Sequence, residues 1–66
     1  MKVNVNTLNL ALARSCMTKK ELANKSGVDI VTISRIISKT QKPRPKTIGK
    51  IAKALDVPVE ILIDEY

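Results

Sequence analysis

The spacing of apolar residues along the chain predicts a series of short helices. Leu8 and Leu12 stand one helical turn apart, and Asn6 or Thr7 can serve as the N-cap just before them. We therefore expect the first helix over residues 7–16.

A capping signal marks the next helix. Thr18 and Glu21 form a Ser/Thr-x-x-Glu capping box, in which the hydroxyl and the carboxylate each satisfy a free backbone amide at the helix start. Gly27 is the residue type best able to adopt the left-handed conformation that ends a helix. The sequence thus predicts a helix over residues 19–25, followed by a turn.

Asp29 is a good N-cap for a third helix over residues 30–38, because its carboxylate favours the positive end of a helix dipole. The β-branched residues of this segment argue mildly against a helix by propensity alone, but a lone strand would have no partner. A helical wheel gives this helix an apolar side and an outer side. The apolar side holds Ile33, Ile36 and Ile37. The outer side holds Val31, Ser34, Arg35 and Ser38.

Prolines organise the rest of the chain. Residues 39–46 are expected to form an exposed basic loop, since Pro43 disfavours helix at the residue before it, and Pro45 suits the first turn of a helix. The inward positions of that helix follow the i, i+3, i+4, i+7 pattern: Ile48, Ile51, Ala52 and Leu55. Pro58 can open a last short helix over residues 58–64. Five helices and no strand make a compact all-α bundle, a single domain over residues 1–66.

The chain has 66 residues, one cysteine and no histidine. Cys16 therefore cannot form an internal disulfide, and the usual ligand sets for zinc are missing. Because Cys16 ends an apolar helical stretch and has no histidine to activate it, we expect Cys16 to be a small buried apolar side chain rather than a reactive thiol.

Charge is unevenly distributed in a chain whose net charge is +6. All 12 Lys and Arg lie within residues 1–55, where Glu21 and Asp29 are the only acids, and residues 56–66 hold every other acid and no base. The basic part predicts a polyanion as partner, with a merely solvated charged surface as the alternative.

Several classes of function fit the sequence poorly. No stretch approaches the ~18 apolar residues of a membrane span, and the first residues lack the apolar run of a signal peptide, so a cytoplasmic protein is expected. With no histidine, metal-ligand set or Gly-rich phosphate cradle, we expect neither an enzyme nor a cofactor, and no small-molecule ligand. Tyr66 is the only aromatic residue, which disfavours RNA binding by base stacking.

Residue sizes identify the second and third predicted helices as a helix-turn-helix. Where one helix passes close over the other, the motif needs a small residue at the crossing, a permissive residue in the turn and a branched apolar residue in the gap. Ala23, Gly27 and Ile33 meet these needs. The other inner positions are also apolar: Leu22, Val28 and Ile36.

Five strings, in this order and spacing, resemble the lambda-repressor-like family of helix-turn-helix proteins, also called the Cro/cI-type or XRE family. They are residues 17–23 (MTKKELA), 27–29 (GVD), 32–36 (TISRI), 42–43 (KP) and 47–57 (TIGKIAKALDV). The resemblance covers nearly the whole chain. It implies that the helix over residues 30–38 is a recognition helix that enters the major groove of double-stranded DNA.

Two groups of DNA-contacting residues follow from the resemblance and the helical wheel. The base-reading candidates lie on the recognition helix: Ile30, Val31, Thr32, Ser34 and Arg35. The phosphate-binding candidates flank that face: Thr18, Lys19, Ser38, Lys39, Thr40, Lys42 and Arg44. Arg35 can make a bidentate contact to guanine, with a phosphate clamp or a solvated side chain as the alternative. Lys2 is expected to be a solubility charge.

The sequence departs from the family at two places. Many relatives carry polar residues, often glutamine, where Ile30 and Val31 stand; here these two can touch thymine methyl groups, and Ile30 can equally belong to the core. Relatives often pair an arginine of the first helix with a glutamate of the third, whereas Leu12 and Ile37 stand here. An apolar pair can replace a buried ion pair without loss of stability.

The sequence therefore predicts a transcriptional regulator, in the simplest form a repressor that binds its operator as a homodimer. The candidate dimer contacts are Ile61, Ile63 and Tyr66, with ordinary core packing as the alternative. A protein-interaction module, such as an antitoxin-like or adaptor subunit with secondary DNA binding, is the rival function. The acidic and apolar C-terminal segment is the reason for that rival.

Overall fold

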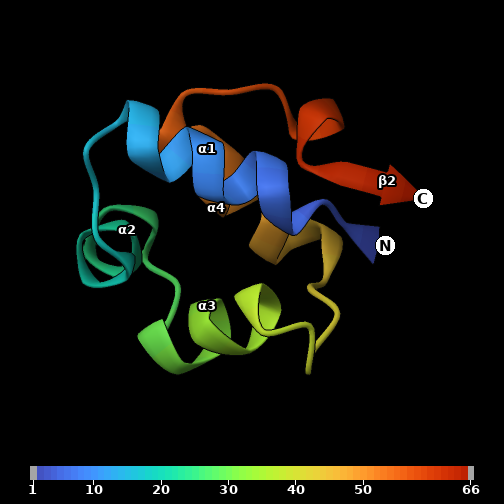
Figure 1. Ribbon diagram of the computed structural model, residues 1–66. Helices are drawn as coiled ribbons and strands as arrows, with labels where there is room; N and C mark the ends of the chain where they lie inside the picture. The colour runs from blue at the N-terminus through green and yellow to red at the C-terminus, as the bar shows by residue number, and fades with distance from the viewer. Residues whose placement is uncertain (1, 66) are drawn as a thin grey trace.

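The computed structural model describes residues 2–65 and shows a mostly helical globule (Figure 1). Its elements are β1 (Lys2–Val3), α1 (Val5–Arg14), α2 (Lys19–Ser26), α3 (Ile30–Ile37), α4 (Pro45–Leu55), the 3₁₀ helix η1 (Val59–Ile61) and β2 (Ile63–Glu65). The helical bundle expected from the sequence is confirmed, although it contains four α-helices rather than five. Within residues 2–65, no helix has both the length and the apolar character that crossing a bilayer requires.

Local capping determines where α2 and α3 begin and end. The Thr18 hydroxyl accepts a hydrogen bond from the Glu21 N–H at 3.1 Å, and the Glu21 carboxylate accepts one from the Thr18 N–H at 3.0 Å. Gly27 ends α2 in the left-handed conformation, with φ 74°. Asp29 then caps α3 by accepting from the Val31 N–H at 3.4 Å. The capping box and both helix boundaries at this turn are confirmed.

The first helix starts earlier than the sequence pattern predicts. It runs over Val5–Arg14 instead of residues 7–16, and its N-cap is Asn4, whose side-chain oxygen accepts from the Thr7 N–H at 3.0 Å. Asn4 is fixed in that position because its own N–H donates to the Leu62 carbonyl at 2.8 Å. A contact between the two ends of the chain thus selects the cap, which no local pattern reveals.

The prediction of a C-terminal helix over residues 58–64 is wrong, and so is the prediction of no strand. Only Val59–Ile61 forms a single 3₁₀ turn, after which Ile63–Glu65 pairs antiparallel with Lys2–Val3, Val3 opposite Ile63. β-Branched residues favour this extended pairing. The N-terminal residues carry no strand signal of their own, so the strand partner of Ile63–Glu65 was missed.

A single apolar core joins all the helices. It contains seven side chains that are fully buried: Leu8, Leu22, Ile33, Ile36, Ile48, Ile51 and Leu62. α2 packs against both α3 and α4, and α1 packs against α3 (Figure 1). Leu12 is buried and Ile37 packs against the same core, so the apolar pair that replaces an ion pair in relatives contributes to this core.

Cys16 is exposed, contrary to the expectation of a buried side chain. It adopts a left-handed conformation with φ 53°, in the turn that closes α1. The Met17 N–H donates to the Leu12 carbonyl at 3.0 Å, which folds the chain back and lets Met17, rather than Cys16, pack against the core.

Replacing each of the two glycines by alanine is expected to change stability in opposite directions. An added Cβ meets nothing within 4 Å at either Gly27 or Gly49. At Gly27, whose φ is +74°, the left-handed backbone makes Gly27→Ala destabilising by about 1–2 kcal/mol. At Gly49, inside α4, Gly49→Ala should stabilise by roughly 0.5–1 kcal/mol. Urea denaturation of both variants measures the two effects. A loss of stability in Gly49→Ala would contradict the account of Gly49, and unchanged stability in Gly27→Ala would contradict the account of Gly27.

Candidate nucleic-acid interface

The crossing of α2 over α3 has the residues that a helix-turn-helix requires. Ile33 is fully buried between the helices, Leu22 is equally buried, and Ala23 packs against the core at the crossing. Gly27 makes the turn, and its N–H donates to the Ala23 carbonyl at 3.0 Å. The inner face predicted from residue size is confirmed, and α3 consequently turns its opposite face outward.

The outward face of α3 combines apolar and polar groups. Val31 is 48% exposed and Ile30 39% exposed, which excludes Ile30 from the core and resolves the alternative that the sequence leaves open. Arg35 is exposed one turn further on, while Thr32 and Ser34 are half-buried beside it. All five base-reading candidates therefore lie on or beside the surface that α3 presents to solvent.

Two of the candidate phosphate contacts have hydroxyl groups that are already bonded within the chain. The Arg35 carbonyl accepts hydrogen bonds from the Ser38 hydroxyl at 3.1 Å, the Thr40 hydroxyl at 3.2 Å and the Thr40 N–H at 2.9 Å. The two hydroxyl oxygens are also 3.0 Å apart. Phosphate oxygens accept hydrogen bonds, and a hydroxyl has only one proton to donate. In this geometry Ser38 and Thr40 cap the end of α3 and have no free proton for DNA.

Thr18 differs from these two residues. Its hydroxyl oxygen accepts from the Glu21 N–H in the capping box, so its proton remains available to an acceptor outside the chain. Lys19 is exposed next to it, in the first turn of α2. The start of α2 can therefore donate to a phosphate through a hydroxyl, an ammonium group and the positive end of the helix dipole.

The loop after α3 carries exposed cations on a buried anchor. Lys39, Lys42 and Arg44 are exposed, whereas Pro43 between them is buried and fixes the loop against the body of the protein. Lys39 has φ 63°, a left-handed conformation that sends the chain away from α3. The loop is thereby held at the C-terminal end of the proposed reading helix.

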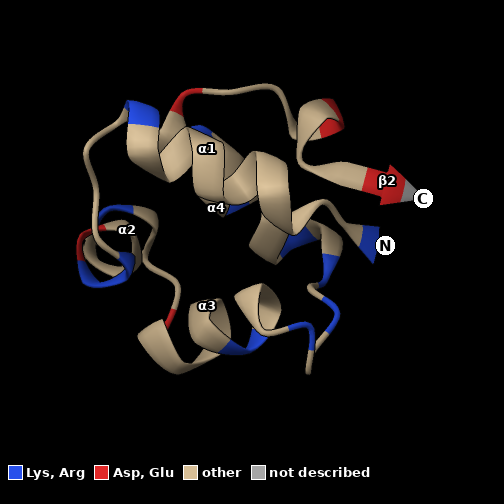
Figure 2. Cartoon of the chain, in the orientation of Figure 1, with Lys and Arg blue, Asp and Glu red and all other residues tan. Residues whose placement is uncertain are grey.

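Lys2 adds a cation to this region that the sequence pattern assigned to solubility. Strand pairing brings β1 to the end of α3, where Lys2 shares a pocket with Lys39 and Lys42. Figure 2 shows Lys and Arg around α2, the end of α3 and the following loop, whereas Asp and Glu gather after α4. No local signal in the sequence reveals the position of Lys2, because it depends on pairing between the chain ends.

The three candidate dimer contacts differ in their positions. Ile61 is 43% exposed and remains available to a second copy, whereas Ile63 is only 8% exposed and packs in the core. Tyr66 lies outside the described residues. Ile63 therefore follows the core-packing alternative. Among residues 2–65, no group of three or more His, Cys, Asp and Glu side chains is arranged to hold a metal ion.

The assignment of Thr40 as a cap of α3, rather than a phosphate contact, can be tested by removing its hydroxyl. Thr40→Val keeps the side-chain shape but loses the bond to the Arg35 carbonyl, and should lower the free energy of unfolding by about 0.5–1.5 kcal/mol. The salt dependence of DNA affinity should stay unchanged, because the hydroxyl has no free proton for a phosphate. Thr40→Ser, which keeps the hydroxyl, is the control. Unchanged stability together with weaker DNA binding would show that Thr40 contacts DNA instead.

Comparison with known proteins identifies the family. A family model described as helix-turn-helix matches residues 17–62, which include the two crossing helices, α4 and the following 3₁₀ turn. No curated protein and no solved structure is significantly similar to the chain. Since the family model covers more than half of the sequence and the geometry of α2, turn and α3 agrees with it, the chain belongs to the Cro/cI-like XRE family of helix-turn-helix proteins, a family of DNA-binding regulatory domains.

Proposed function

We propose that this protein is a sequence-specific transcriptional regulator that inserts α3 into the major groove of an operator. The observation that carries the proposal is the exposed face of α3, which includes Arg35, together with the exposed cations on α2 and in the loop after α3. An α-helix fits the major groove of B-DNA, where the edges of the base pairs can be distinguished. Repression follows most simply, because occupancy of a promoter requires no surface beyond the one that binds DNA.

Three kinds of contact read the operator sequence. Arg35 donates two hydrogen bonds to O6 and N7 of a guanine. Ile30 and Val31 contact thymine methyl groups, which explains why apolar side chains are exposed on a surface that faces DNA. Thr32 and Ser34 supply short hydroxyls that bond either bases or the adjacent backbone. The expected half-site thus contains both a guanine and at least one thymine.

Phosphate contacts fix the register of α3 in the groove. Thr18 and Lys19 hold one strand at the start of α2, and the loop cations Lys39, Lys42 and Arg44 hold backbone beyond the end of α3. These groups act on any sequence, so they contribute affinity and salt dependence rather than specificity. Ser38 and Thr40 support this set indirectly, by holding the loop in place through the Arg35 carbonyl.

Dimerisation is part of the proposal because one short helix reads few bases. Half-sites of helix-turn-helix operators lie one helical turn apart, about 34 Å. The Cα extents of the chain are 26 × 21 × 19 Å, so two copies in side-chain contact can occupy neighbouring half-sites. Of the two candidate dimer contacts that the structure describes, Ile61 is exposed and Ile63 is buried.

A protein-interaction module is the second candidate function, and one observation favours it. Leu10 is 64% exposed and Ile61 43% exposed, and both line a single groove between α1 and the segment after α4. An apolar groove of this kind suits a partner protein as well as a second copy. The two functions differ in whether the isolated protein selects a DNA sequence.

Arg35 and Lys42 are expected to affect DNA binding in different ways. Arg35→Ala should cost about 1–3 kcal/mol on the preferred site and relax the preference at one base pair. Lys42→Ala should weaken binding to all sequences alike and reduce the log–log salt slope by about one unit. Fluorescence anisotropy with matched and randomised duplexes, at several salt concentrations, separates the two effects. Identical behaviour of both variants would remove Arg35 from the base-reading group.

Selection from a random duplex pool tests the function as a whole. At about 0.15 M salt, where the Debye length is about 8 Å, the recovered sequences should share a motif with two-fold symmetry. Its half-sites should be centred about 10 base pairs apart. Absence of any enriched motif would contradict the regulator proposal and favour the protein-interaction function.

A further inference from the structure

The outward face of α3 begins with two exposed apolar side chains. Ile30 is 39% exposed and Val31 is 48% exposed, in the first turn after the Asp29 N-cap. Neither side chain has a hydrogen-bonding group, and β-branching restricts χ1 in a helix, so little rotamer entropy is lost when they are covered. Residues near the N-terminus of a recognition helix are the ones that contact base edges in a helix-turn-helix. The surface offered to the bases is therefore apolar at this end of α3.

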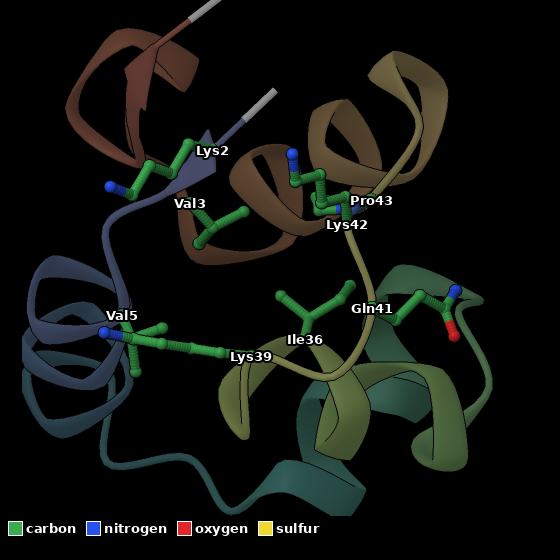
Figure 3. Close-up of a pocket in the computed structure, with 8 residues that line it drawn as sticks. All are labelled: Lys2, Val3, Val5, Ile36, Lys39, Gln41, Lys42 and Pro43. Carbon is green, nitrogen blue, oxygen red and sulfur yellow. The ribbon is translucent and has the colours of Figure 1, made fainter.

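The apolar residues at the other end of α3 offer no such surface. Ile36 points into the pocket between β1 and the basic loop (Figure 3), but its side chain is only 1% exposed. Pro43, in the wall of the same pocket, is also buried. Of the isoleucine and valine side chains of α3, only Ile30 and Val31 are exposed. An apolar contact between α3 and DNA therefore has to be made by the first turn of the helix.

The chemistry of the major groove decides what an apolar side chain can distinguish there. Each base pair presents hydrogen-bond donors and acceptors, and the one apolar group among them is the methyl on C5 of thymine. An apolar side chain placed against a donor or acceptor leaves that group without the water it would otherwise bind, which is unfavourable. Ile30 and Val31 therefore respond to the presence or absence of a C5 methyl group, and not to the hydrogen-bonding pattern that separates thymine from cytosine.

We propose that the protein reads the C5 methyl group itself, so that 5-methylcytosine replaces thymine at this position and C5 methylation of a cytosine there strengthens operator binding. 5-Methylcytosine carries its methyl on the same ring carbon as thymine. Its N4 amino group and its guanine partner differ from those of a thymine pair, but Ile30 and Val31 have no group that bonds to either. The inference rests on the proposed function and adds a means of regulation, because a half-site with cytosine at this position binds well only when that cytosine is methylated.

The position of Val31 makes it the main contact with the methyl group. Val31 and Arg35 stand one helical turn apart on the outer side of α3, whereas Ile30 lies closer to the edge of that side. A rise of about 1.5 Å per residue separates Val31 from Arg35 by about 6 Å along the helix axis. Successive bases of one strand are about 3.4 Å apart. The methylated pyrimidine is thus expected within about two base pairs of the guanine that Arg35 reads.

Modified duplexes test the proposal on the operator recovered by selection. Replacing each thymine in turn by uracil removes one methyl group and leaves the hydrogen-bonding groups of the base pair intact. At one position per half-site, uracil should weaken binding about fourfold, the effect of exposing one methyl group. At that position 5-methylcytosine should bind within about twofold of thymine, and unmodified cytosine about fourfold more weakly than 5-methylcytosine. Tolerance of uracil at every thymine, or equal binding of cytosine and 5-methylcytosine, would overturn the proposal.

Substitution of Val31 tests whether its side chain is responsible. Val31→Ala removes the two γ-methyl groups and improves helix propensity, so the variant is expected to fold. The roughly fourfold ratio between the thymine and uracil duplexes should disappear in this variant, a coupling that a general loss of affinity would not produce. Leu10→Ala, which removes an exposed apolar side chain from α1, is the matched control and should keep the ratio whatever its effect on affinity. Retention of the full ratio in Val31→Ala and Ile30→Ala alike would overturn the assignment.

Selection from a second random pool separates this inference from the proposed function. In a pool in which 5-methylcytosine replaces every cytosine, the motif should contain 5-methylcytosine as well as thymine at the position where the ordinary pool gives thymine alone. A motif that is the same in both pools would overturn the inference and leave the regulator proposal intact. No motif in either pool would contradict the regulator proposal itself, and the inference with it.

Discussion

The packing of Ile33 and Ile36 against the core is the interaction on which the proposed function depends. α3 has only eight residues, four of them isoleucines, and a helix of that length and composition is unstable alone in water. Burial of Ile33 and Ile36 therefore keeps this segment helical. The same burial determines the rotation of the helix, and through it the direction of Val31 and Arg35.

The end of α3 couples stability to the position of the charged loop. Hydrogen bonds from Ser38 and Thr40 converge on the Arg35 carbonyl, and Lys39 between them adopts a left-handed conformation. The backbone of the proposed base-reading residue is thus the anchor of the proposed phosphate-binding loop. A loop that is fixed in this way loses little conformational entropy when it binds DNA, which favours affinity.

Most of the helix-turn-helix could be predicted from residues that are close together in the sequence. The contacts between the two ends of the chain could not be predicted in this way. The capping box at Thr18, the glycine turn and the proline start of α4 each depend on neighbouring residues, and each is confirmed. The N-cap at Asn4 and the strand at Ile63 depend on pairing across the whole chain, and sequence periodicity contains no information about such pairing.

The candidate interface was predictable in part for the same reason. A helical wheel separates the inner from the outer face of α3, because the period of a helix fixes both. It cannot show whether a hydroxyl is already bonded to a nearby carbonyl, as in Ser38 and Thr40, since that depends on the turn after the helix. Nor can it place Lys2 at the same pocket as Lys42, because that position depends on strand pairing.

The strand pairing that the periodicity missed also creates the pocket. Without β1 against β2, Val3 would not face Ile36, and the wall beside the basic loop would be open to solvent. The family model begins at residue 17, so Val3 lies outside the matched region, whereas Ile36 and Pro43 lie inside it.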